Sequence, residues 1–291
     1  MLKSFVIKFR SVMLGSSISS LQQLGDLSLI STWKKMQSES SNPLNQFGAK
    51  YFSQNDEDGL LIEILRRIGL DRGTFAEFGV GDGTENNTLI LLASGWSGFW
   101  VGGEKLVFDH ELCANHFSFL ERWIDRDNVT SRFREGLNLL KSDDIDVLSL
   151  DLDGNDIYLV EELLLNNVNP KLFIVEYNAK FPPPIKWQIE YDSHHCWKHD
   201  DYFGASLSSF NELFNKNNYT LICCNITGAN AFFIRNDFLS HFDDTPRDLM
   251  SIYFPPMYYL FQSSGHKPSA KTIEQMLKLS TPCNYGDYIT N

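Results

Sequence analysis

The chain carries little positive charge for its size. Its 25 Lys and Arg residues stand against 37 Asp and Glu residues, giving a net charge of -12 over 291 residues. That balance opposes a broad electrostatic hold on nucleic acid or on an anionic membrane surface. No segment approaches the roughly 18 uninterrupted apolar residues that a membrane span requires, and Lys8 and Arg10 interrupt the apolar N-terminus before it reaches signal-peptide length. We therefore expect no nucleic-acid partner and no membrane span, and an amphipathic N-terminal helix is favoured over a membrane-surface anchor.

Cysteine is scarce, and the spacing of the cysteines does not predict disulfide pairs. The sequence contains no C-x-x-C motif, and its cysteines are odd in number: Cys113, Cys196, Cys223, Cys224 and Cys283. A disulfide framework uses an even set at regular spacings. The cysteines are therefore expected to be reduced thiols in a cytoplasmic protein.

The remaining composition is that of a globular protein. With 43% hydrophobic and 21% charged residues, 19 Gly and 10 Pro, collagen-like, low-complexity and disordered chains are excluded. The length favours one dominant core with extensions over two equal domains. We expect an N-terminal extension over residues 1–50, a folded domain over 51–235 and an aromatic, Pro-containing C-terminal extension over 236–291.

The hydrophobic pattern within this domain alternates between two periods. A helix over 56–68 is followed by apolar runs that predict strands at TFAEFG, GFWVGG, VTSRF, DVLSLD and LFIVEY, and helical patterns lie at NTLILLAS, around 109–122, at DIYLVEELLLNN and over 207–217. Nearly continuous apolar runs are typical of parallel strands buried on both faces. YTLICCN and AFFIR flank the turn residues ITGAN and must pair as an antiparallel hairpin. The prediction is a Rossmann-like, doubly wound α/β fold whose seven-stranded, mostly parallel sheet ends in an antiparallel hairpin.

The first strand leads into a glycine-rich loop with acidic residues in it. Glu77, Gly79, Gly81, Asp82 and Gly83 give the spacing E-x-G-x-G-D-G. Alternate glycines let the backbone turn tightly and let a ligand approach without meeting a Cβ. Dinucleotide sites use G-x-G-x-x-G and bind a diphosphate, which would here face nearby negative charge. A cationic, phosphate-free ligand fits better, and the alternative is a glycine-rich turn with no ligand.

This loop resembles the first motif of class I S-adenosylmethionine-dependent methyltransferases. The resemblance implies S-adenosyl-L-methionine as the cofactor, with contacts from Glu77, Gly79, Gly81, Asp82, Gly83, Glu104 and Asp151. Glu104 follows the second predicted strand, where such enzymes place an acid that accepts both ribose hydroxyls. NAD-binding folds use the same device, so Glu104 does not choose between the two cofactors.

Further segments are similar to a subgroup, the FkbM-like methyltransferases. They are FSQNDEDGLL, FAEFGVGDGTENNT, GWSGFWVGGE, LSLDLDGND, IVEYN and YFGASLSSF, and they lie between about residues 52 and 235. The Gly-Gly pair before Glu104 departs from the subgroup's pattern. The resemblance implies methyl transfer to a small-molecule or carbohydrate acceptor, with a hydroxyl group as the expected site of methylation. The alternatives are an NAD-dependent oxidoreductase and a non-catalytic domain that retains the fold.

Oxygen-rich side chains follow the fourth and fifth predicted strands. Asp151 and Asp153 end the one, and Glu176 and Asn178 end the other. Because parallel strands end at the same edge of a sheet, these groups should meet where open α/β folds bind their ligands. Carboxylate and amide oxygens suit Mg²⁺, so Asp153, Glu176 and Asn178 are candidate metal ligands and Asp153 is also a candidate catalytic residue. The alternative is that the aspartates after the fourth strand turn the chain and cap the next helix.

A second polar cluster lies in the long connection after the fifth strand. His194 and His195 are candidate bases for removing a proton from an acceptor hydroxyl. A solvated substrate loop is one alternative, and a zinc site that also uses Cys196 and His199 is another, although this spacing matches no standard tetrahedral pattern. The leading function is O-methylation of a sugar or another small hydroxylated acceptor. The sequence leaves the acceptor and the oligomeric state open, a homo-oligomer included.

Overall fold

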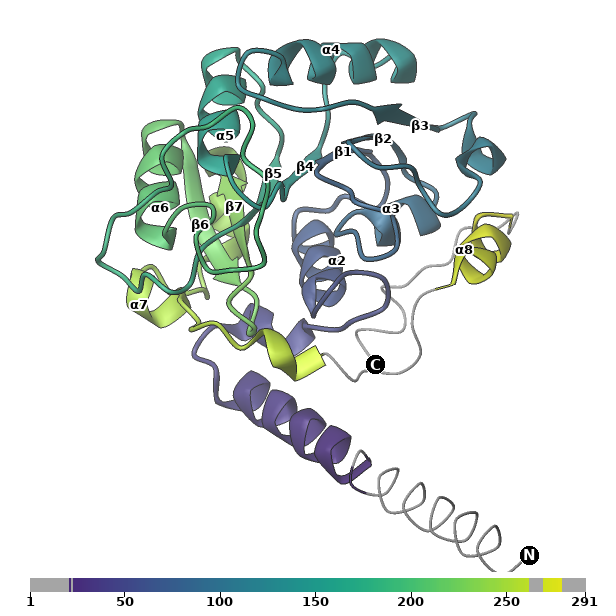
Figure 1. Cartoon of the computed structure of the whole chain (residues 1–291). Coiled ribbons are helices and arrows are strands. Elements are labelled where there is room, and N and C mark those ends of the chain that lie inside the picture. The colour runs from purple at the N-terminus through teal and green to yellow at the C-terminus, as the bar shows by residue number, and fades with distance from the viewer. Residues whose placement is uncertain (1–20, 22, 262–268, 279–291) are drawn as a thin grey trace, which may run out of the picture.

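The fold is built on one mixed sheet. The computed structural model describes residues 21, 23–261 and 269–278. Within them, seven strands have the order β3-β2-β1-β4-β5-β7-β6 (Figure 1). Their bounds are β1 Thr74–Phe78, β2 Ser97–Gly102, β3 Phe117–Glu121, β4 Val147–Leu150, β5 Leu172–Glu176, β6 Tyr219–Cys224 and β7 Asn230–Arg235. β7 runs antiparallel to both β5 and β6, and the pairs from β3 to β5 are parallel. The predicted fold class, with its antiparallel terminal hairpin, is confirmed.

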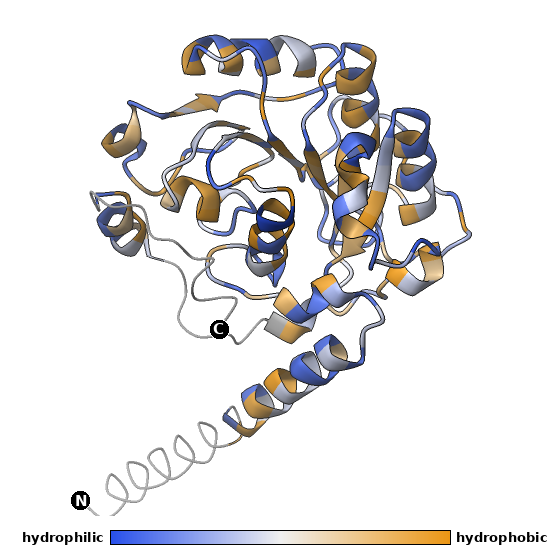
Figure 2. Ribbon diagram, turned by 180° about the vertical axis from the view of Figure 1, so that it is seen from behind, coloured by the Kyte–Doolittle hydropathy of each residue, from blue (hydrophilic) through white to orange (hydrophobic). Residues whose placement is uncertain are grey.

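Helices cover both faces of the sheet, as the buried strands require. One face carries α4 Val129–Leu140, α5 Asp156–Leu165 and α6 Leu207–Lys216, and the other carries α2 Glu57–Arg67, α3 Leu89–Ala93 and α8 Ala270–Leu277. α7 Leu249–Ile252 and the short 3-10 helices η1 Pro43–Phe47, η2 His110–Cys113, η3 Asn236–Phe242 and η4 Tyr258–Phe261 complete the described elements. The apolar strands lie at the centre of the molecule, and the polar faces of the helices point outward (Figure 2).

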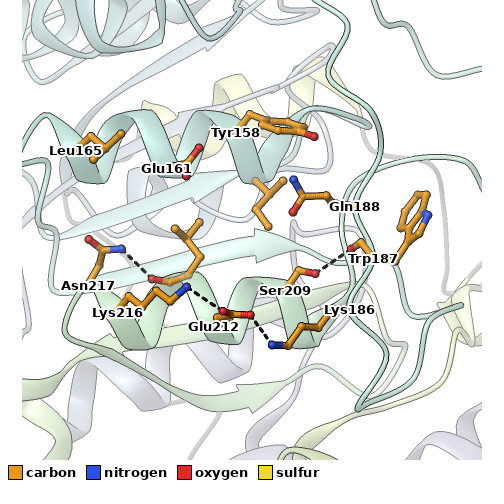
Figure 3. Close-up of a pocket in the computed structure, with 12 residues that line it drawn as sticks. Tyr158, Glu161, Leu165, Lys186, Trp187, Gln188, Ser209, Glu212, Lys216 and Asn217 are labelled. Atoms are coloured by element: carbon orange, nitrogen blue, oxygen red, sulfur yellow. Dashed lines mark hydrogen bonds and ion pairs between the residues drawn. The ribbon is translucent and has the colours of Figure 1, made fainter.

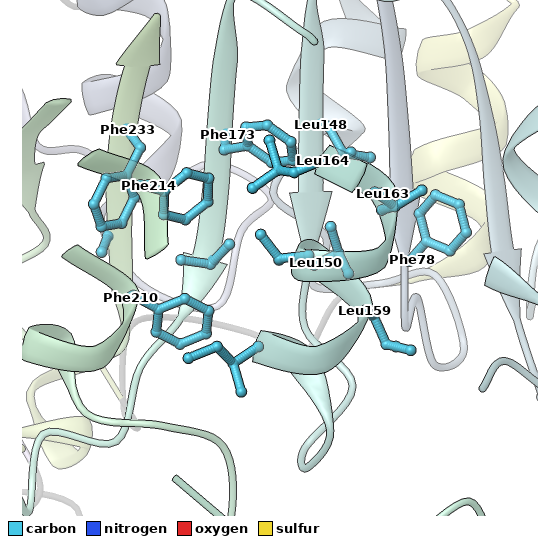
Figure 4. Close-up of a cluster of buried hydrophobic side chains, with 14 of the residues drawn as sticks. Phe78, Leu148, Leu150, Leu159, Leu163, Leu164, Phe173, Phe210, Phe214 and Phe233 are labelled. Atoms are coloured by element: carbon cyan, nitrogen blue, oxygen red, sulfur yellow. The ribbon is translucent and has the colours of Figure 1, made fainter. Parts of the chain in front are cut away.

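Each face of the sheet has its own hydrophobic core. Phe78 of β1, Leu150 of β4 and Phe173 of β5 point to the α5 and α6 side, where they meet Leu163 and Phe214 (Figure 4). The alternate residues of the same strands belong to the core under α2 and α3. This alternation fixes which side of the sheet the residue at each strand end faces.

Two predicted elements are wrong. The pattern around 109–122 is not a helix but η2 followed by β3, which pairs parallel with β2. VTSRF is not a strand but the start of α4, whose buried residues Val129, Phe133 and Gly136 recur at helical spacing. The short apolar runs in both segments fit either period. In α4, the absence of a side chain at Gly136 lets the helix pack closely on the ring of Phe99 in β2.

The N-terminal part of the chain contributes to the core. Leu44 and Asn45 are fully buried, and the Asn45 side-chain amide donates to the carbonyl oxygen of Cys224 at 2.8 Å. Before this segment, a helix over residues 23–39 extends away from the body of the protein (Figure 1). The division into three regions at residues 50 and 235 stays a prediction.

The thiols and the membrane prediction can be checked only within the described residues. Cys113, Cys196, Cys223 and Cys224 are free there, while Cys283 lies outside the described residues. None of the helices in this part of the chain combines the length and the apolar character needed to cross a bilayer.

Candidate functional site

The glycine-rich loop leaves β1 at the carboxyl edge of the sheet. Gly79, Gly81 and Gly83 adopt φ values of +87°, +50° and +85°, in the left-handed region that side chains disfavour. A Cβ on Gly79 would collide with the carbonyl oxygen of Asp151, and one on Gly83 would lie 2.8 Å from Leu106 Cδ2. Gly81 differs, because no atom lies within 4 Å of the position that its Cβ would take. Gly79 and Gly83 therefore allow close packing of the protein, and Gly81 is the glycine that borders open space.

Glu77 holds the segment that enters α3. Its buried carboxylate accepts hydrogen bonds from the amide of Asn87 at 3.0 Å and from the amide and hydroxyl of Thr88 at 2.9 Å and 2.6 Å. Burial raises the pKa of Glu77, and these donors oppose the rise. We assign Glu77 to shaping the loop, and its direct contact with a cofactor stays a prediction.

Asp82 and Glu104 are both exposed at this edge. Asp82 Oδ1 accepts from the amide and the hydroxyl of Thr84 at 3.0 Å and 2.7 Å, which stabilises the turn. Glu104 follows β2, and β2 lies beside β1 in parallel, so the two loops are neighbours. Val107 joins them by donating its amide to the carbonyl oxygen of Asp82 at 3.0 Å. The structure thus brings Glu104 near the glycine loop, as a ribose-binding residue requires.

Three carboxylates meet where β4 and β5 end. Asp151, Asp153 and Glu176 each offer one oxygen, and these oxygens all lie within 4.8 Å of one another. β4 and β5 pair in parallel, which brings their carboxyl ends together. Glu176 Oε2 is buried and has no hydrogen-bond partner among the described residues. The group is an all-oxygen donor set of the kind that hard divalent cations prefer.

Electrostatics at this cluster favour a proton or a cation. Burial, followed by the neighbouring carboxylates, raises the pKa values of Asp151 and Glu176 well above their ordinary range. Burial and the charge of Asp156 raise the pKa of Asp153 to about 6. Like charges this close disfavour full ionisation, so the cluster binds a proton or a positive ligand more readily than an isolated carboxylate does.

Asn178, which the sequence predicts as a metal ligand, is hydrogen-bonded through both the nitrogen and the oxygen of its side-chain amide. Its amide nitrogen donates to the carbonyl oxygens of Asp201 and Phe203, both at 2.9 Å, and its oxygen accepts from the amide of Lys180 at 3.1 Å. Asn178 therefore fastens the long loop after β5 to the sheet. Asp151, which the sequence predicts as a cofactor contact, belongs to the candidate ligand set, and metal ligation by Asn178 stays a prediction.

Asp156 holds the turn after β4, which is one part of the alternative, but no side-chain hydrogen bond in the described residues caps α5. Its two carboxylate oxygens accept from the amides of Leu152 at 2.8 Å and Gly154 at 3.0 Å. Asp153 has a left-handed φ of 56° within the turn that Asp156 holds. The turn therefore leaves the carboxylate of Asp153 available at the edge of the sheet.

The histidine loop brings one predicted base to the cluster and leaves the other in solvent. The ring of His195 packs against Gly154, and its Nε2 is buried without a partner in the described residues. The charges of His195 and His199 act to lower the pKa of Asp153, so both rings lie near it. The side chain of His194 is 93% exposed. His199 was grouped with this loop by sequence but was not predicted as a site residue.

Tyr258 is a site neighbour that the sequence did not predict. Burial and the charges of Glu176 and Asp151 raise the pKa of Tyr258, so its hydroxyl is within electrostatic range of these two carboxylates. The segment before it is fixed by hydrogen bonds from the Tyr177 hydroxyl to the Phe254 carbonyl at 2.9 Å and from the Met257 amide to the Thr227 carbonyl at 2.8 Å. The aromatic run in the C-terminal extension was the only sequence signal for this position.

A buried polar network lies on the α2 side of the same edge. Glu57 Oε1 accepts from the side-chain amides of Asn225 at 2.6 Å and Asn230 at 2.9 Å. Asn230 is the cross-strand partner of Glu176, and its own amide oxygen is buried without a partner in the described part of the chain. The sequence suggested only that Glu57 is an acid at a helix N-terminus, because nothing local indicates that it contacts β7.

One pocket lies in the long loop after β5, where it includes His195, and another lies beside α5. Glu190, Tyr191, Asp192, His195, Lys198, Asp200 and Tyr202 line a pocket of about 520 Å³. The larger pocket, of about 610 Å³, lies between α5 and α6, where Glu212 pairs with Lys186 and Lys216 (Figure 3). It contains none of the predicted site residues. The smaller pocket, which contains His195, is the better candidate for an acceptor.

Comparisons with known proteins give limited information about this chain. No family model and no curated protein matches the sequence. Among solved structures, the chain is similar to the methyltransferase domain of bacterial CtHen1-C, with a TM-score of 0.37 and 14% sequence identity. The match covers 62% of this chain and 97% of that domain.

Proposed function

We propose that the protein is an S-adenosyl-L-methionine-dependent methyltransferase that methylates a hydroxyl group of a small, polyhydroxylated acceptor such as a sugar. The observation that carries the proposal is the loop geometry at the carboxyl edge. Gly81 borders open space, whereas Gly79 and Gly83 are filled by protein. The loop's spacing and its acidic residues favour a cationic cofactor over a dinucleotide. The FkbM-like segments support this class of enzyme.

The cofactor would lie across the ends of β1 and β2. Glu104 would accept the ribose hydroxyls through its two carboxylate oxygens. The sulfonium charge would be balanced by the acidic edge formed by Asp151, which follows β4 beside β1, and Glu176, which ends β5 on the far side of β4. Methyl transfer is an in-line displacement, so the main task of these residues is to orient the donor toward the acceptor.

The acceptor side is formed by Asp153 and His195. His195 presents an unpartnered Nε2 near Asp153, and it lines the smaller pocket. We assign it to accepting the hydroxyl proton as the oxygen attacks the methyl group. Asp151, Asp153 and Glu176 fit a divalent cation, since they supply oxygen atoms alone and one oxygen of Glu176 has no partner in the described residues. Such an ion would lower the pKa of an acceptor hydroxyl bound to it.

Calorimetry and a transfer assay test the proposal in two steps. The purified chain should bind S-adenosylhomocysteine and not NAD, and binding of NAD alone would favour the oxidoreductase. A metabolite pool incubated with methyl-labelled cofactor should then yield labelled hydroxylated products. Binding without transfer to any pool would favour a non-catalytic domain. Running the assay with and without chelator measures the contribution of a metal.

A further inference from the structure

The histidine loop, residues 192–201, is held at its start by a side chain from the segment between β4 and α5. Asn155 donates its side-chain amide to the carbonyl oxygen of Asp192 at 2.7 Å. The backbone amide of His195 donates to the same carbonyl oxygen at 2.9 Å. The backbone that carries the proposed general base is therefore fastened to the carboxyl edge of the sheet.

Trp123 reaches the same loop from the segment after β3, and it also borders the end of β2. Its indole Nε1 donates to the carbonyl oxygen of Ser193 at 3.2 Å. The amide of Arg122 donates to the carbonyl oxygen of Gly102 at 2.8 Å, which joins the ends of β2 and β3. A Cβ on Gly103 would lie 3.7 Å from Trp123 Cε3. One side chain therefore lies between the loop after β2 and the histidine loop.

A second contact from the segment after β3 fixes only the approach to the histidine loop. The amide of Arg126 donates to the hydroxyl of Tyr191 at 3.1 Å. The ring of Tyr191 packs against Tyr158 of α5, with 5.3 Å between the ring centroids. These residues attach the loop to α5, whereas Trp123 also borders the loop that leads to the candidate ribose-binding residue.

The two glycines before Glu104 differ in their surroundings. A Cβ on Gly102 would lie 2.8 Å from Val80 Cγ2, so the close approach of Val80 disfavours a side chain there. A Cβ on Gly103 would make an ordinary contact with the indole of Trp123, which is itself 54% exposed. The indole therefore keeps a free surface beside the loop that carries Glu104.

We propose that Trp123 is a positioning residue that couples cofactor binding to the placement of His195; this inference rests on the proposed function. A cofactor held by Glu104 would adjoin the free surface of the indole and restrict the motion of the ring. Because the indole N–H is bonded to Ser193, this restriction passes to the histidine loop. Such coupling is reciprocal, so a bound acceptor should also strengthen cofactor binding.

Hydrogen exchange of the full chain measures this coupling without a transfer assay. In the wild type, S-adenosylhomocysteine should slow exchange of the backbone amides of residues 192–201 by about fivefold or more. Trp123→Phe keeps an aromatic ring beside Gly103 and removes the donor to Ser193. This variant should lose most of the ligand-dependent protection and still bind S-adenosylhomocysteine. A residue that only anchors the loop would change exchange equally with and without the ligand.

The transfer assay gives a second measurement on the same variant. If Trp123 positions His195, Trp123→Phe should lower kcat by about tenfold or more, because small displacements of a reacting group are costly. The KM for the cofactor should change little. A variant that raises the KM for the cofactor and keeps kcat would show that the indole only binds the cofactor, which overturns the coupling.

Trp197→Phe is the matched control, because it makes the same chemical change inside the histidine loop. The indole of Trp197 is also partly exposed, at 41%, and donates to the carbonyl oxygen of Asp200 at 2.7 Å. Protection by S-adenosylhomocysteine should persist in this variant. Equal loss in both variants would overturn the proposal, as would protection that Trp123→Phe retains.

Two results in the wild type separate this inference from the proposed function. If S-adenosylhomocysteine binds in calorimetry but leaves exchange of residues 192–201 unchanged, the coupling is wrong and Trp123 is an anchor of the loop. If S-adenosylhomocysteine does not bind at all, the proposed function is wrong and the coupling fails with it.

Discussion

Asp151 and Glu176 stand at the carboxyl ends of the parallel strands β4 and β5, and their carboxylate oxygens lie within 4.8 Å of each other. Each carboxylate raises the pKa of the other, so the pair favours a state in which one carboxyl group holds a proton. A divalent cation between them would displace that proton, because it needs ionised ligands. Proton and metal therefore compete for the same place at the edge of the sheet.

This competition predicts opposite effects of pH with and without Mg²⁺. The pKa values of Asp151 and Glu176 are raised in the folded state, and that of Asp153 is raised to about 6. Groups with raised values stabilise the fold fully below their unfolded pKa, and this stabilisation is lost as pH rises through the folded pKa. Without metal, the melting temperature should fall as the pH rises from about 4, near the unfolded pKa of an aspartate, through the folded pKa of Asp153 at about 6. Added Mg²⁺ should restore it, and more strongly at the higher pH.

The variant Asp151→Asn provides the control for this experiment. It keeps the shape of the side chain and removes one of the competing charges. At the higher pH it should melt above the wild type without metal and gain less from Mg²⁺. If Mg²⁺ does not change the wild-type melting temperature at any pH, the metal site in the proposed function is wrong, and the carboxylates bind a proton only.

Gly81→Val should abolish or weaken cofactor binding by at least about tenfold, because the side chain would enter the open space that we assign to the ligand. Gly69→Val is a matched control. Gly69 also has a positive φ, at +68°, and also has no atom within 4 Å of a built Cβ. Gly69 follows the end of α2 and precedes the start of β1, whereas Gly81 follows the end of β1. Calorimetry with S-adenosylhomocysteine should therefore separate the two variants, and similar affinities would place the ligand elsewhere.

The two neighbouring histidines should differ in their effect on methyl transfer. His195→Ala should lower kcat by about a hundredfold or more if this ring is the general base. His194→Ala should have little effect, because its side chain is 93% exposed. Cofactor affinity should be unchanged in both variants. Equal activity of the two variants would assign the proton to another group, and the chelator result should be obtained first.

The sequence predicts the parts of the site that depend on strand ends and glycine spacing. The loop at Gly81 and the acids at Asp153 and Glu176 follow from where buried apolar runs stop, and the structure places them at one edge. The errors at β3 and α4 have a different origin. Short segments such as these satisfy both periodicities, so only their packing against the sheet decides between helix and strand.

The choice among neighbouring polar residues also depends on tertiary structure. Asn178 follows β5, and its side-chain amide donates to the carbonyl oxygens of Asp201 and Phe203 in the long loop after that strand. Tyr258, which senses the charges of Glu176 and Asp151, lies more than 80 residues beyond β5 in the sequence. No local pattern reports such contacts, because they depend on how the C-terminal segment crosses the sheet edge.

Asn230 should be important for stability because it links the buried network to the acidic edge. It is 2% exposed, donates to Glu57, and lies opposite Glu176. Asn230→Asp should destabilise the fold by about 2–4 kcal/mol, since it replaces a buried donor with a third carboxylate. Asn236→Asp, directly after the other end of β7, is exposed and should cost less than about 0.5 kcal/mol. Chemical denaturation measures both, and the difference between them should shrink at acidic pH, where a carboxyl at position 230 gains a proton and can again donate to Glu57.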